Sequence, residues 1–134
     1  MNLRNLFRVV GVLFLLFGVS WLLAPKAMPA AYGVEIDAYT AFFLQQLGAI
    51  NVASAVLCFL VSGMAHSPAR QAVVTFFFVE QVLAGIVSLY GVISGAVPSP
   101  AGWISVIFNL IFALAFGYFR FIRPEANVTP ELQT

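Results

Sequence analysis

Long apolar runs alternate with short polar breaks along most of the chain. The runs cover residues 6–23, 39–61, 71–91 and 101–121. Each is close to the roughly 20 residues that an α-helix needs to cross about 30 Å of hydrocarbon. Because lipid cannot satisfy open backbone groups, helices are the expected spanning elements. The pattern therefore predicts an all-α membrane protein with four transmembrane helices.

The breaks between the runs contain prolines, which do not continue a helix. These prolines are Pro25, Pro29, Pro68, Pro98 and Pro100. Short connections favour an up-down-up-down four-helix bundle, and no internal repeat divides the chain. We expect one transmembrane domain over residues 1–123 and a polar cytoplasmic tail over residues 124–134.

The first run has the flanks of a secretory signal peptide, because Arg4 precedes it and Arg8 lies in its first turn. However, the run is long for the apolar core of such a peptide. No A-x-A cleavage site follows it in residues 24–31. We therefore interpret this run as a retained helix.

Composition supports lipid as the solvent of this chain. It is 62% hydrophobic and 8% charged, with a mean hydropathy of +1.00, whereas soluble domains are about a quarter charged. A net charge of +1 without a basic run argues against nucleic acid as a partner. The single cysteine, Cys58, excludes disulfides and thiolate zinc sites within one chain, and His66 has no companion ligand nearby. We expect no metal and no cofactor.

The basic residues predict the orientation. With four spans, the N-terminus, the second loop and the C-terminus share one side of the membrane. That side carries Arg4, Arg8, Arg70, Arg120 and Arg123. The other side carries only Lys26, with Glu35 and Asp37. The positive-inside rule therefore places both termini in the cytoplasm.

Aromatic residues agree with this orientation. They lie at the predicted outer ends of the helices, where an aromatic belt belongs, and are Trp21, Tyr39, Tyr90 and Trp103. We expect residues 30–38 to lie along the outer surface as part of that belt.

The most informative polar residue is Glu80, near the middle of the third run. An acidic side chain at that depth costs roughly 2.5–3.5 kcal/mol on insertion scales. No Lys or Arg lies in the middle of any run to pair with it. We expect Glu80 to be protonated, hydrogen-bonded to neutral partners, or facing water or a bound cation.

Other polar residues share this depth. Helical rise places Glu80 about 14 Å and Asn51 about 15 Å from one side, and Asn109 about 12 Å from the other. Gln81 adjoins Glu80 but points about 100° away from it around the helix. Gln46 lies nearer the outer face, where it either lines an entrance to the layer or, as we prefer, bonds to a neighbouring helix.

This layer has two interpretations. In the first, it is a structural hydrogen-bond network between closely packed helices, and small residues at spacings of three and four favour such packing. These faces are Gly48-Asn51-Ala55, Glu80-Ala84-Ser88 and Asn109-Ala113-Gly117. In the second, Glu80 binds a ligand or exchanges a proton, since an acid within the membrane is a functional-site hypothesis by default.

Several short motifs resemble the DoxX-like group of small bacterial four-helix membrane proteins. They are Phe17-Gly18-Val19 leading to Pro25, then Tyr32-Gly33-Val34, then Leu47-Gly48-Ala49. The resemblance covers about the first two helices. It implies a four-helix fold in a bacterial inner membrane, and it implies no particular activity.

No catalytic motif is present in the sequence. We therefore expect a non-enzymatic protein, either an accessory subunit or a binder of an apolar ligand such as a lipid, a quinone or a hydrophobic amine. Its candidate residues are Glu80, Gln81, Asn51, Asn109 and Gln46. One alternative is a proton-coupled transporter with Glu80 as the exchanging acid, and another is an enzyme resembling lipid or sterol isomerases. Expected partners are membrane lipid, a hydrophobic small molecule, and further copies of the chain or a larger membrane complex.

Overall fold

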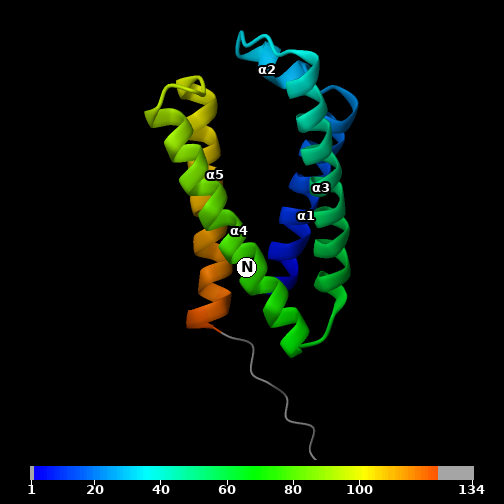
Figure 1. Cartoon of the computed structure of the whole chain (residues 1–134). Helices are drawn as coiled ribbons and strands as arrows, with labels where there is room; N and C mark the ends of the chain where they lie inside the picture. Colours follow the sequence, from blue (N-terminus) through cyan, green and yellow to red (C-terminus); the bar gives the residue numbers. More distant parts are fainter. Residues whose placement is uncertain (1, 124–134) are drawn as a thin grey trace, which may run out of the picture. The chain divides into compact units, whose positions relative to one another are not determined.

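The computed structural model describes residues 2–123, which are almost entirely helical (Figure 1). The long helices are α1 (Leu3–Leu23), α3 (Ala38–Gly63), α4 (Pro68–Ile93) and α5 (Ser99–Gly117). A five-residue helix, α2 (Ala27–Ala31), follows α1, and a π-helical turn, η1 (Tyr118–Ile122), continues α5. No strand occurs within residues 2–123. The predicted all-α fold with four long helices is confirmed, and the predicted tail lies outside the described residues.

Within residues 2–123, four helices are long and apolar enough to cross a membrane, when η1 is counted with α5. This is the architecture of a multi-pass membrane protein. All four long helices begin before the apolar runs do, and polar caps precede three of them. The Asn2 side chain accepts from the Asn5 N–H at 2.9 Å, Asp37 from the Thr40 N–H at 2.7 Å, and Ser67 from the Arg70 N–H at 3.2 Å. The first turns that these caps stabilise contain few apolar residues, so hydropathy alone predicts helices that are too short.

The helix α2 was not predicted. Residues 30–38 were expected to lie along the outer surface, whereas the chain forms a helix slightly earlier. Pro29 is tolerated there because a first helical turn needs no donor from its backbone. Gly33 follows with φ 72°, a conformation that glycine adopts without strain. The Trp21 indole N–H also donates to the Met28 sulfur at 3.4 Å, which ties α2 to the end of α1.

The chain divides into two compact units, with the boundary between Gly63 and Met64. The first unit is an antiparallel hairpin of α1 and α3, in which Gly18 meets Gly48 and Gly11 meets Cys58. The second unit is an antiparallel hairpin of α4 and α5. Each hairpin is held by its own set of interhelical contacts.

Small residues at intervals of seven form the contact surface of α3 in the first hairpin. Every seventh residue is buried, and these residues are Ala41, Gly48, Ala55 and Ser62. On α1, the buried glycines Gly11 and Gly18 are also seven residues apart. A repeat of seven keeps one face of a helix against its partner, and small side chains let the two backbones approach closely.

Aromatic rings and glycines fix the register of the second hairpin. The rings of Phe77 and Phe116 stack with their centroids 5.4 Å apart. The ring of Phe78 packs against Gly117, and Val92 packs against Gly102 at the other end. These contacts define which face of α4 is turned toward α5.

Candidate functional site

The candidate residues are distributed over both units. Glu80 and Gln81 lie on α4, and Asn109 lies on α5, all in the second hairpin. Gln46 and Asn51 lie on α3 in the first hairpin. The candidate residues therefore form two groups, one in each hairpin.

Asn109 forms a hydrogen bond between the helices of its hairpin. Its side-chain Nδ2 donates to the Ser88 hydroxyl oxygen at 3.2 Å. Gly85, about one turn before Ser88, also faces this asparagine, since a Cβ at that glycine would meet the Asn109 Cβ at an ordinary contact distance of 3.5 Å. This pair is a local packing contact and uses one donor of the Asn109 amide.

Gln81 lies on the same face of α4. It is seven residues before Ser88, which brings it within about 20° of the same direction. Its side chain is buried, with 5% of its surface exposed. Along α4, Gln81 therefore lies between two contacts with α5, the one made by Phe78 and the one made by Ser88.

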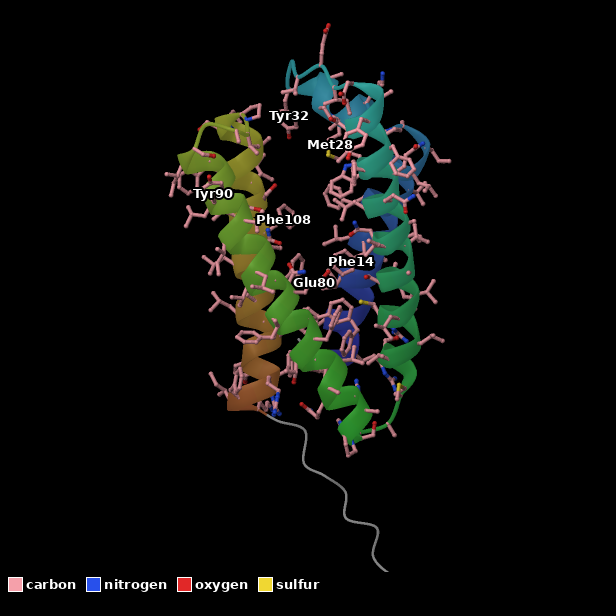
Figure 2. The ribbon with its side chains drawn as sticks, viewed as in Figure 1. Phe14, Met28, Tyr32, Glu80, Tyr90 and Phe108 are labelled. Atoms are coloured by element: carbon pink, nitrogen blue, oxygen red, sulfur yellow. The ribbon has the colours of Figure 1, made fainter. Side chains whose placement is uncertain are left out.

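Glu80 projects about 100° away from that face. Figure 2 shows it midway along α4. Within residues 2–123, its Oε2 atom is buried and has no hydrogen-bond partner. Its polar neighbour is the side chain of Gln81. The nearest basic residue on the same helix is Arg70, about 15 Å away along the axis, so no cation on α4 neutralises the carboxylate.

Asn51 bonds within its own helix, because its Nδ2 donates to the Leu47 carbonyl oxygen at 2.8 Å. Gln45 connects the two helices of the first hairpin, donating to the Leu22 carbonyl oxygen at 3.2 Å. The neighbouring Gln46 is exposed. Of these three residues, only Gln45 forms a hydrogen bond to the other helix.

A second cluster of polar residues lies at the start of α4 and in η1. From the sequence, the arginines of this cluster predicted only the orientation in the membrane. Both side-chain polar atoms of Gln71, and the Nε of Arg120, are buried without a hydrogen-bond partner among the described residues. Arg70 is buried, with its Nη1 3.4 Å from the His66 ring nitrogen Nδ1. The register of α4 against α5 is needed to place these residues at the same end of the hairpin, and the sequence pattern does not provide it.

The chemistry available at Glu80 is the binding of a proton, a hydrogen-bond donor or a cation. Within residues 2–123 there is no group of three or more His, Cys, Asp or Glu side chains that could hold a metal ion. Cys58 is buried in the first hairpin. No protein-family model, curated protein or solved structure matches this chain.

Proposed function

We propose that this protein binds an apolar small molecule within the membrane and holds the polar end of that molecule with Glu80. The observation that carries the proposal is the buried Glu80 Oε2 atom, which has no hydrogen-bond partner among residues 2–123. A lipid, a quinone or a hydrophobic amine would offer the apolar body and the polar group that such a site requires.

Energetics favour a bound partner for this carboxyl group. Inserting an acid at mid-membrane costs roughly 2.5–3.5 kcal/mol, and leaving a buried polar atom unsatisfied costs a further 1–3 kcal/mol or so. A ligand hydroxyl or ammonium that donates to Oε2 would recover much of this free energy. An ammonium would be the stronger partner, because charge-assisted hydrogen bonds are about twice as strong as neutral ones.

Gln81 is the residue best placed to assist, since its amide is the polar neighbour of the Glu80 carboxyl group. Asn109 and Asn51 contribute less to this proposal than the sequence suggested. Their amides already donate to Ser88 and to the Leu47 carbonyl oxygen. The proposed binding group is therefore Glu80 with Gln81.

The proposed setting is a bacterial inner membrane with both termini in the cytoplasm. The support for this orientation is the distribution of the basic residues and of the aromatic residues at the helix ends. The resemblance of short motifs in and between α1 and α3 to the DoxX-like group supports the bacterial setting.

The test is to extract the protein in its native lipid and identify bound small molecules by native mass spectrometry. Glu80→Gln retains the size of the side chain and removes its charge. Loss of one charged hydrogen bond weakens binding by about 1.5–3 kcal/mol, so occupancy should fall at least tenfold at a ligand concentration below the dissociation constant. Glu35→Gln is the matched control, because Glu35 is exposed and lies outside the four long helices.

Circular dichroism and gel filtration check that both variants retain the wild-type fold. A bound molecule that is lost equally from both variants would contradict a site at Glu80. Recovery of a stoichiometric polypeptide partner, with no small molecule in the wild-type protein, would instead identify an accessory subunit.

A further inference from the structure

The second hairpin carries a cluster of positive charge at the end where α4 begins and α5 finishes. Within residues 64–123 its arginines are Arg70, Arg120 and Arg123, and its only acid is Glu80. Glu80 lies about 15 Å from Arg70 along α4. The described part of this end therefore has three guanidinium groups and no carboxylate.

The register of the hairpin brings Gln71 and Arg120 to the same end, with Gln71 about 3 Å further along the axis. Phe77 and Phe116 stack and fix the two helices against each other. Gln71 lies six residues before Phe77, and Arg120 lies four residues after Phe116. At 1.5 Å per residue these positions are about 9 Å and 6 Å from the stacked rings, toward the same end.

Both residues also occupy the faces that the helices turn toward each other. Gln71 is seven residues before Phe78, whose ring packs on Gly117, and Arg120 is three residues after Gly117. Figure 1 shows α4 and α5 diverging toward this end of the hairpin. Their side chains form no hydrogen bond with each other, and the Gln71 amide and the Arg120 Nε are buried without partners among the described residues.

The local backbone at Arg120 is unusual. It lies within the π-helical turn η1, which closes with a bond from the Arg123 N–H to the Tyr118 carbonyl oxygen at 2.9 Å. Such turns are rare and occur often at functional sites. The guanidinium lies 5.6 Å from the Phe121 ring centroid, so an aromatic side chain supports it from one side.

We propose that the phosphate of an anionic lipid headgroup binds between the start of α4 and η1. Arg120 donates from Nε to a phosphate oxygen, and the Gln71 amide donates to the same group. Arg70 and Arg123 add positive charge around it. A phosphate fits because it has several acceptor oxygens and a negative charge, and basic pockets between membrane helices are known to select such headgroups.

The experiment measures lipid binding to the full chain in neutral detergent by native mass spectrometry, with phosphatidylglycerol and phosphatidylcholine of identical acyl chains. We expect phosphatidylglycerol to bind at least tenfold more tightly. Arg120→Gln should weaken phosphatidylglycerol binding about tenfold, the effect of losing a charged hydrogen bond, with little change for phosphatidylcholine. The matched control is Arg4→Gln, since Arg4 is exposed at the start of α1, and its affinity should stay within about twofold of the wild type.

Two further variants keep the test decisive if Arg120→Gln does not fold. Arg120→Lys retains the charge without the planar fork of donors and should give an intermediate affinity. Gln71→Leu removes the amide and should weaken phosphatidylglycerol binding severalfold. Equal losses in Arg120→Gln and Arg4→Gln, or no preference for phosphatidylglycerol in the wild type, would overturn the proposal.

Two competitors separate the possible sources of negative charge. Inorganic phosphate at millimolar concentration should not displace the lipid, and displacement would identify a site for free phosphate instead. The carboxylates of the tail are tested by changing Glu125 and Glu131 together to Gln. A tenfold rise in lipid affinity would show that the chain itself neutralises the cluster, and this result would also overturn the proposal.

Discussion

The crossing of α1 and α3 allows a quantitative test of the fold, because replacing Gly48 by alanine inserts one methyl group into the closest helix contact. A Cβ at this position would lie 2.8 Å from the Gly18 carbonyl oxygen and 2.8 Å from the Leu22 nitrogen. Both neighbours are backbone atoms of α1. Neither can rotate away, so the two helices must separate.

The expected cost follows from this geometry. Carbon atoms pack best at about 3.5–4.0 Å, so the helices must move apart locally by roughly 0.7 Å or more. Overpacking of this kind typically costs about 1–3 kcal/mol. Alanine regains up to about 1 kcal/mol through its better helix propensity. We therefore expect Gly48→Ala to lower the free energy of unfolding by about 1–2 kcal/mol.

Equilibrium unfolding in mixed micelles of neutral detergent and dodecyl sulfate measures this change, followed by circular dichroism and by the fluorescence of Trp21 in a Trp103→Phe background. Two glycines provide matched controls. A Cβ at Gly63 meets nothing within 4 Å, and a Cβ at Gly85 meets only the Asn109 Cβ at 3.5 Å. Both alanine variants should be at least as stable as the wild type. If Gly48→Ala is as stable as these controls, the close crossing of α1 and α3 is refuted.

Two further predictions concern single hydrogen bonds. Asn109→Ala and Ser88→Ala should each lower the free energy of unfolding by about 0.6 kcal/mol. The double variant should lose little more, because both changes remove the same hydrogen bond. Additive losses in the same unfolding assay would contradict the pairing. Hydrogen bonds from Thr40 hold the pKa of Asp37 below its usual 3.8. This contribution to stability is therefore present above pH 3.8 and is lost as the pH falls through the lower folded value. Circular dichroism across this range should show an acid-induced loss of helix in the wild type that is reduced in Asp37→Asn, and identical profiles would argue against the cap.

The long helices could be predicted because membrane-spanning segments must be apolar and about 20 residues long. The remaining features depend on which face of a helix meets which partner. Ala41 and Ser62 belong to the contact surface of α3, but Ala and Ser are common throughout membrane helices. Only the neighbouring helix shows that a repeat of seven is the relevant one.

The same limit applies to the candidate site. The depth of Glu80 follows from counting residues, whereas its direction requires the register of α4 against α5. Asn109 was recognisable as a polar residue within the membrane, but its bond to Ser88 depends on which face of α4 meets α5. The π-helical turn around Arg120 has no signature in the apolar pattern, because η1 differs from an α-helix only in its backbone hydrogen bonds.

The division at Gly63 also has a consequence for the time course of synthesis. All contacts described for the first hairpin, including the meeting of Gly18 and Gly48, join residues that precede this boundary. A ribosome adding about 5–20 residues per second needs several more seconds to complete the seventy or so residues that follow. Helix pairing takes far less time than this. The first hairpin can therefore close in the bilayer before both α4 and α5 have entered it, and the order of translation becomes the order of assembly.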